Sequence, residues 1–289
     1  MMSKFLLSIG LMAIILGCGF TAGAKLSAEK AKSDSSIFAA DTSRMNKFKL
    51  EKIIKVSGSK LYTDPVENYY VSNQISIWKT SSQNNLNFVY SLKRSGRITS
   101  IDAGDPMKVL VFYKDLSLIT FLDNFLAEES SIQLMDFNLD QAEVVCKALN
   151  NGIWVYDIKQ DKLVKINAVT LNVDIEILNI QRIIGEAFSP TLMMERNNGL
   201  YLNDPQKGIY VFDNYGAFIR KIPEANISNF NVIDDNLTFR RNNDIFTLNK
   251  ETLVLSKIYS DSTMTDFSIT EKKLYILNGD SLHIYKLRP

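Results

Sequence analysis

Short runs of alternating apolar and polar residues recur along the chain, each followed by a turn and a second short apolar run. Alternation with a period of two residues indicates β-strands that bury one face. The second runs recur at intervals of about forty residues, the spacing of a four-stranded propeller blade. The pairs are Gln74–Lys79 with Leu86–Leu92, Leu118–Asp123 with Ser131–Asp136, Lys162–Asn167 with Val173–Leu178, Lys207–Asp213 with Ala217–Ile222, and Asp244–Asn249 with Leu253–Tyr259.

A sixth run, Ser281–Leu287, has no partner after it because the chain ends at Pro289. The segment Lys49–Val56 has the missing pattern and stands before the first blade, so we expect it to pair with Ser281–Leu287 and close the ring. Closure matters because an open sheet edge invites association with other chains. The sequence therefore predicts an all-β fold, a six-bladed β-propeller over residues 47–289 closed by an N-terminal strand.

Turn chemistry agrees with this prediction. Asp213-Asn214-Tyr215-Gly216, Asn249-Lys250 and Asn197-Asn198-Gly199 stand between apolar runs, where residues that tolerate positive φ are favoured. In the fourth blade we expect Arg182–Phe188 as the first strand and Thr191–Asn203 as the second. No segment after the leader keeps an apolar stripe with a 3.6-residue period, so helix content should be very low.

The N-terminus has the features of an export leader. Lys4 supplies a basic start, Phe5–Phe20 an apolar stretch, and Ala22-Gly23-Ala24 a cleavage site, which predicts a signal peptide over residues 1–24. Ile15-Leu16-Gly17-Cys18 offers an alternative, a lipobox in which the leader ends at residue 17 and Cys18 carries a lipid. Residues 25–46, rich in Ala, Ser, Lys and Asp, are expected to form a disordered linker.

The composition excludes some classes of partner. The formal net charge is +1, from 33 basic and 32 acidic residues, and no long run of one sign occurs. Nucleic acid is therefore not an expected partner, and contact with a membrane is expected only through a lipid on Cys18. On either route Cys18 is not available for a disulfide, because it is cleaved off or carries a lipid, and Cys146 is left as the one other cysteine. We expect it to be a small buried core residue rather than a reactive or pairing thiol.

Candidate chemistry is sparse. His283 is the only histidine, so a histidine zinc site or a Ser-His-Asp relay has no ligand set or base to draw on. We expect no catalytic residue and no cofactor. Calcium in a central channel stays open as an alternative, because several acidic residues fall at strand ends or in loops. These residues are Asp102, Asp105, Glu195, Asp204, Asp234 and Asp235.

The most patterned stretch runs from Leu200 to Gly216 and contains a Pro turn at Asp204-Pro205 and a Gly turn after Tyr215. Its structural interpretation is a blade hairpin. Its functional interpretation is that Asp204 and Tyr215 lie on a binding surface, and we take Asp102, Asp204 and Tyr215 as the candidate interaction residues.

Several pieces of the chain resemble a family of secreted propeller proteins of Bacteroidota, in the same order from about Asp41 to the end. They are Ile98–Asp102, Pro106–Asp115, Gly152–Asp157 and Leu200–Gly216. The resemblance implies a propeller of the cell envelope with a cleaved leader, and it brings no catalytic motif with it. More loosely, the blades are similar to those of WD40, NHL and quinoprotein propellers, without the Trp-Asp and Gly-His signatures of WD40.

We therefore expect a non-enzymatic interaction scaffold in the bacterial cell envelope. It would face the periplasm, bind an envelope protein and be monomeric outside that complex. The alternative is a channel-site enzyme or a small-ligand (carbohydrate) binder that uses a central metal or carboxylates.

Overall fold

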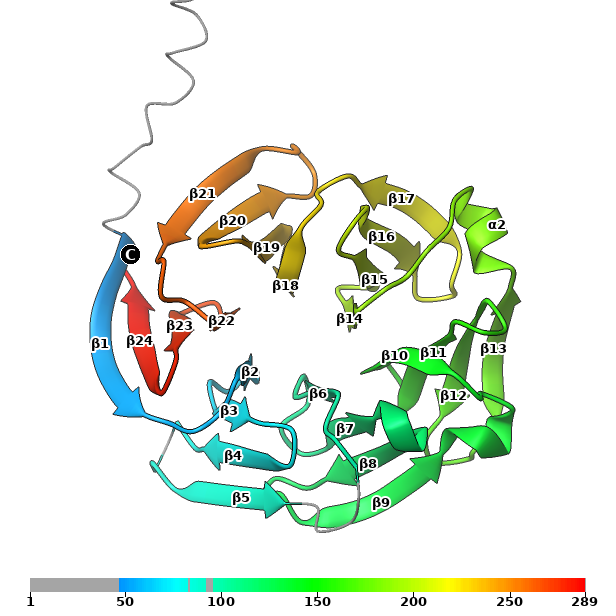
Figure 1. The fold of residues 1–289 in the computed structure, drawn as a ribbon, viewed down its shortest axis with the longest axis horizontal. Helices are drawn as coiled ribbons and strands as arrows, with labels where there is room; N and C mark the ends of the chain where they lie inside the picture. Colours follow the sequence, from blue (N-terminus) through cyan, green and yellow to red (C-terminus); the bar gives the residue numbers. More distant parts are fainter. Residues whose placement is uncertain (1–46, 83, 92–95, 289) are drawn as a thin grey trace, which may run out of the picture. The chain divides into compact units, whose positions relative to one another are not determined.

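The structure, a computed structural model, describes residues 47–82, 84–91 and 96–288. Figure 1 shows these residues as a ring of four-stranded antiparallel sheets around a central axis, and the six sheets make a six-bladed β-propeller. The predicted fold is confirmed. The predicted leader, linker and lipidation site at Cys18 lie outside the described residues.

The first strand of each blade lies nearest the axis of the ring and the fourth lies at the perimeter (Figure 1). Blade 1 comprises β2 (Lys60–Thr63), β3 (Tyr69–Ser72), β4 (Ser76–Thr80) and β5 (Asn87–Ser91). Blade 2 comprises β6 (Ser100–Asp102), β7 (Val109–Tyr113), β8 (Leu118–Leu122) and β9 (Glu128–Gln133). Blade 3 comprises β10 (Ala142–Lys147), β11 (Gly152–Asp157), β12 (Lys162–Asn167) and β13 (Val173–Leu178). Blade 4 comprises β14 (Leu192–Arg196), β15 (Gly199–Asp204), β16 (Gly208–Asp213) and β17 (Phe218–Ile222). Blade 5 comprises β18 (Ile227–Ile233), β19 (Asn236–Arg241), β20 (Asp244–Asn249) and β21 (Leu255–Ser260). Blade 6 comprises β22 (Asp266–Ile269), β23 (Lys273–Asn278), β24 (Ser281–Leu287) and β1 (Phe48–Lys55).

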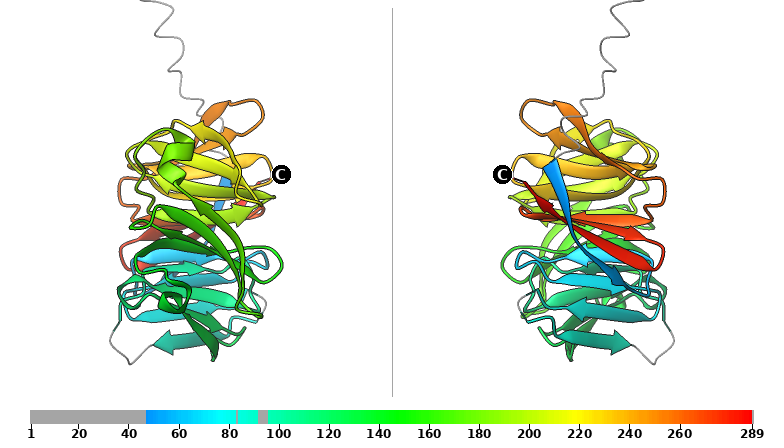
Figure 2. Two further views of the ribbon diagram at one scale, coloured as in Figure 1. Left: turned by 90° about the vertical axis from the view of Figure 1, so that its right-hand side faces the viewer. Right: turned by 90° about the vertical axis from the view of Figure 1, so that its left-hand side faces the viewer.

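The N-terminal strand closes the ring as predicted. β1 pairs antiparallel with β24, from Phe48 opposite Leu287 to Lys55 opposite Ser281. Figure 2 shows the two strands side by side at the outer edge of blade 6. The termini of the propeller therefore meet in one sheet.

Two expected strands are wrong. Residues Arg182–Phe188 do not form the first strand of blade 4, because Ile180–Ile184 forms a short helix, α2, before the chain enters β14. The expected single strand Thr191–Asn203 is the hairpin β14–β15. Asn197 and Asn198 adopt φ values of 51° and 60° there, and two successive positive φ angles reverse the chain. Besides α2, the described helical segments include the short 3₁₀ helices Lys114–Leu116 and Leu134–Phe137. None of the helices in the described part is long and apolar enough to cross a membrane.

The hydrophobic core is divided among the interfaces between blades. Six clusters of buried residues form, and each joins two neighbouring blades. Tyr156 and Leu163 of blade 3, for example, pack in one cluster with Leu200 and Tyr210 of blade 4. Both faces of each sheet are thus covered by other sheets, which explains why the inner strands are apolar almost throughout.

Polar side chains also join neighbouring blades. Asp266 of blade 6 accepts hydrogen bonds from the Leu61 amide of blade 1 (3.0 Å) and from Asn229 Nδ2 of blade 5 (2.8 Å). Glu195 of blade 4 accepts bonds from the Leu149 amide (2.8 Å) and Trp154 Nε1 (2.5 Å) of blade 3. These carboxylates satisfy backbone and indole donors that burial would otherwise leave without a partner.

Cys146 lies in the cluster between blades 3 and 4, where its side chain is fully buried. Burial raises the pKa of its thiol well above the usual value, and the nearby charges of Asp102 and Glu195 act in the same direction. The thiolate is the reactive form of cysteine. We therefore expect an aromatic disulfide reagent to label Cys146 only after denaturation. Labelling of the native protein at the rate of a free thiol would contradict the core assignment.

Candidate functional site: the channel and its mouth

The central channel holds a cavity of about 370 Å³. Every blade contributes its first strand to the lining, that is β2, β6, β10, β14, β18 and β22. The lining also includes Pro65, Gly104, Asn197 and Glu271, which lie in the turns after these first strands. Among the described residues of the loops that precede the first strands, only Thr191 contributes. The cavity therefore opens toward the ends of the first strands.

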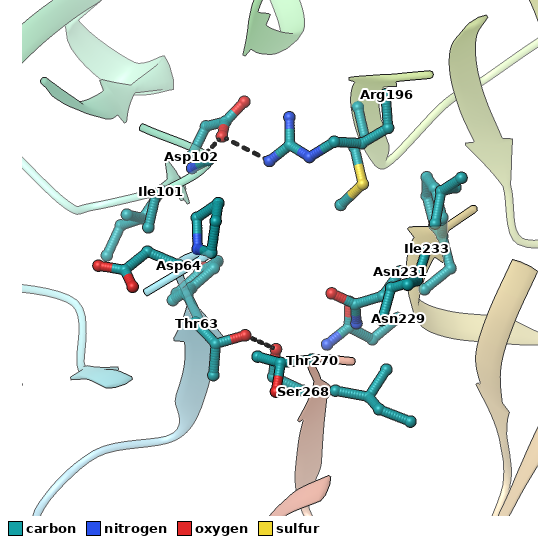
Figure 3. A pocket seen from close by; sticks show the side chains of 18 of the residues that line it. Thr63, Asp64, Ile101, Asp102, Arg196, Asn229, Asn231, Ile233, Ser268 and Thr270 are labelled. Atoms are coloured by element: carbon teal, nitrogen blue, oxygen red, sulfur yellow. Dashed lines mark hydrogen bonds and ion pairs between the residues drawn. The ribbon is translucent and has the colours of Figure 1, made fainter. Parts of the chain in front are cut away.

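One side of the cavity is an ion pair between two blades that are not neighbours. Arg196 Nη2, at the end of β14, lies 3.3 Å from Asp102 Oδ1, at the end of β6 (Figure 3). Asp102 also accepts hydrogen bonds from the Gly104 amide and the Lys147 amide, each 2.9 Å long. Asp102 thus joins blades 2, 3 and 4 at the cavity mouth.

The opposite side carries neutral polar groups. Thr63 Oγ1 of β2 and Ser268 Oγ of β22 share a hydrogen bond of 2.7 Å, and Thr270 follows in the next turn (Figure 3). Asn229 and Asn231 extend this side along β18. Asn229 donates to Asp266 and to the Phe267 carbonyl, whereas the Asn231 amide has no hydrogen-bond partner in the described part of the chain.

The candidate residues fall at different places. Asp102 lies at the cavity mouth, as described above. Tyr215 is 74% exposed in the turn between β16 and β17. The expectation that Asp204 lies on a surface is wrong, because its side chain is buried and accepts hydrogen bonds from the amides of Ser189 and Gln206. Through these bonds Asp204 links the segment before β14 to the turn after β15. Asp102 and Tyr215 lie toward the same face, since their turns follow a first and a third strand.

His283 and the candidate acidic residues do not gather into a metal-binding cluster in the part of the chain that the structure describes. His283 lies on β24, where Nε2 is 3.2 Å from Ser281 Oγ, away from the channel strands. Within residues 47–82, 84–91 and 96–288, no three His, Cys, Asp or Glu side chains are arranged to hold a metal ion. Sequence reasoning missed Arg196, Thr63, Ser268 and Asn231. The available signal was their place on the first strands or at their ends.

The face around the cavity mouth has a second feature. We call the face formed by the turns after the first and third strands of each blade the mouth face. Exposed large apolar side chains occupy these turns in blades 1 to 5: Val66, Leu86, Met107, Phe125, Leu149, Val169, Leu171, Tyr215, Leu253 and Val254. In the described loops of the opposite face, the corresponding residues are only Ile75, Met135 and Ile183.

Two of these leucines adopt an unfavourable backbone conformation. Leu171 (φ 58°) and Leu253 (φ 57°) lie at the same position of the turn between third and fourth strands in blades 3 and 5. Blades 1 and 4 place Asn85 and Gly216 there, residue types that tolerate positive φ. Both leucines are more than half exposed, at 54% and 61%, so burial does not compensate for the conformation.

No family model matches this sequence, and neither does any curated protein. Solved structures share the fold. Virginiamycin B lyase from Staphylococcus aureus is 11% identical with a TM-score of 0.59, covering 83% of this chain and 100% of that chain. The Pan2 WD40 domain from Neurospora crassa is 9% identical with a TM-score of 0.55, covering 84% and 96%. A chain of the Mitotic Checkpoint Complex is 8% identical with a TM-score of 0.57, covering 98% and 100%.

These similarities establish the class of protein, a β-propeller, and nothing finer. The class includes both a lyase and a chain of a multi-protein complex, so function must be argued from the site itself. Membership of a Bacteroidota family stays a prediction from the sequence.

Proposed function

We propose that this chain is a non-enzymatic protein-binding propeller of the bacterial cell envelope, which faces the periplasm and docks an envelope protein on its mouth face. The observation that carries the proposal is the concentration of exposed apolar side chains on that face. Exposed apolar patches on soluble proteins mark interaction sites. Placement in the envelope rests on the predicted leader over residues 1–24.

The leucines at positive φ strengthen this argument. A leucine in the left-handed region costs roughly 1–2 kcal/mol relative to a right-handed conformation, and Asn or Gly avoids most of that cost. A residue that weakens the fold and is exposed to solvent is better explained by binding than by stability. Leu171 and Leu253 are therefore the residues of the mouth face that we expect to contact a partner directly.

The same two positions allow a test that leaves the fold intact. We expect the double variant Leu171→Asn with Leu253→Asn to unfold at the same or a higher temperature than the wild type. Replacement of either leucine by a photo-crosslinking amino acid in living cells should give a discrete adduct with an envelope protein, and copurification of that protein should be lost in the double Asn variant.

The matched control lies on the opposite face. Ile75 is 55% exposed there, so Ile75→Asn removes an apolar area similar to that of one of the two leucines and should leave copurification unchanged. Equal adducts from position 75, or an unchanged complex in the double variant, would contradict docking on the mouth face.

A further inference from the structure

The cavity in the channel has a different chemical character from the apolar turns around it. Three of its ionised groups, Asp64, Asp102 and Arg196, are paired with groups of the protein. The other charged residues of the lining, Glu67, Asp234, Glu271 and Lys272, lie in the turns after the first strands. The Asp102 carboxylate accepts three hydrogen bonds, one of them from Arg196. Asp64 is buried and accepts bonds from the amides of Val66 and Asn68, from Asn68 Nδ2, and from the Tyr70 hydroxyl. A charged ligand would therefore find no uncompensated opposite charge on the first strands, which form the walls of the cavity.

Much of the unused hydrogen-bonding capacity of the first strands is on neutral groups. The Asn231 side chain can donate two hydrogen bonds and accept two, and none of these is used by the described residues. The Thr63–Ser268 hydroxyl pair uses one proton on its own bond and keeps a second. Arg196 donates to the Glu195 carbonyl and to Asp102, so further N–H groups of its guanidinium have no partner among the described residues. Donors and acceptors thus face the cavity from two opposite sides (Figure 3).

Apolar side chains lie between these two polar sides. Ile101, Val145, Met194 and Ile233 are part of the lining. The volume of about 370 Å³ is at the small end of the range for ligand pockets, roughly 300–1,000 Å³. The walls are strands of six blades, so the cavity is formed before any ligand arrives. A compact ligand with hydroxyl groups around its edge and apolar C–H faces matches this distribution.

We propose that the channel cavity is a binding site for an uncharged, hydroxyl-rich small molecule of one or two sugar rings. Arg196 and Asp102 would hold its hydroxyls on one side, and Asn231 with the Thr63–Ser268 pair on the other. The inference goes beyond the proposed protein docking and does not rest on it. None of the exposed apolar residues of the mouth face is part of the cavity lining.

Titration calorimetry and ligand-observed NMR test this site on the full mature chain. The probes are neutral sugars (glucose, galactose, N-acetylglucosamine, maltose and cellobiose) together with cationic glucosamine and anionic glucuronate, each up to about 10 mM, where millimolar binding is detectable. We expect at least one neutral sugar to bind, and the two charged sugars to bind at least about tenfold more weakly. Addition of a chelator should not change the affinity, since no metal takes part.

Two variants locate the binding. Asn231→Ala removes an amide that has no partner among the residues described, so the fold should be kept while affinity falls about fivefold to tenfold. Arg196→Lys keeps a charge beside Asp102 but loses the planar guanidinium, and a similar loss is expected. Tyr215→Ala and the double variant Leu171→Asn with Leu253→Asn change residues outside the lining and should leave affinity within about twofold.

Three results would overturn the proposal. They are the absence of binding by any neutral sugar, binding of glucosamine or glucuronate as tight as that of the neutral sugars, and affinity unchanged in both cavity variants. Loss of sugar binding with an intact protein complex, or the reverse, separates this site from the docking function.

Discussion

A chain that begins after Val56 should lose its cooperative thermal unfolding and aggregate. The deletion removes β1 and leaves the backbone groups of β24 without the partners they have from Phe48 to Lys55. It also removes Phe48, which packs edge-on against Tyr259 with ring centroids 6.3 Å apart, and Ile54 and Val56, which pack in the cluster between blades 6 and 1. Free strand edges template association with other chains.

The destabilisation caused by the deletion should come more from the lost pairing of β1 with β24 than from the lost burial of apolar side chains. Most residues of β1 are exposed, and its Lys and Glu side chains keep its own outer edge from associating. A chain that begins at Lys47 keeps β1 whole and is the matched control, for which we expect the melting transition of the mature protein. Addition of a peptide of residues 47–56 to the deleted chain should restore a cooperative transition in calorimetry. If the chain without β1 melts cooperatively at an unchanged temperature, the role of β1 in closing the ring is contradicted.

Glu195→Ala should lower the free energy of unfolding by about 3–5 kcal/mol, the usual cost of removing one partner from a buried charged network. The Glu195 side chain is 3% exposed and holds the Trp154 indole N–H, the Leu149 amide and, at 3.8 Å, Lys165 Nζ. Without the carboxylate, Lys165 keeps a buried charge over the Trp154 ring and two N–H donors lose their acceptor.

Urea unfolding followed by tryptophan fluorescence measures this change. Glu129→Ala is the control, because Glu129 is exposed on β9 and such surface changes shift stability by no more than about 0.5 kcal/mol. Trp154→Phe in a double-mutant cycle isolates the indole bond, with a coupling energy of about 0.5–3 kcal/mol expected. A loss below about 1 kcal/mol for Glu195→Ala would show that the network between blades 3 and 4 is not what secures that interface.

The sequence was sufficient for the architecture because strand alternation and turn chemistry are local. The pairs of runs about forty residues apart, the Asn turns and the unpaired segment Lys49–Val56 led to six blades closed by β1. The same reasoning failed over Arg182–Phe188, where a short apolar run fits a strand and a helical turn equally well. Burial of Cys146 followed from its place in an apolar run.

The candidate site depends on contacts between residues that are far apart in the sequence, and the spacing of sequence motifs does not reveal such contacts. Thr63 and Ser268 are 205 residues apart, and Asp102 and Arg196 are 94 apart, yet each pair meets in the channel. Asp102 and Asp204 look alike in sequence, since each ends a strand. Asp102 ends a first strand and reaches the channel, whereas Asp204 ends a second strand and is buried in a turn. The local pattern determines the blade, but only closing the ring decides which strand ends converge, because side chains of six separate sheets meet there.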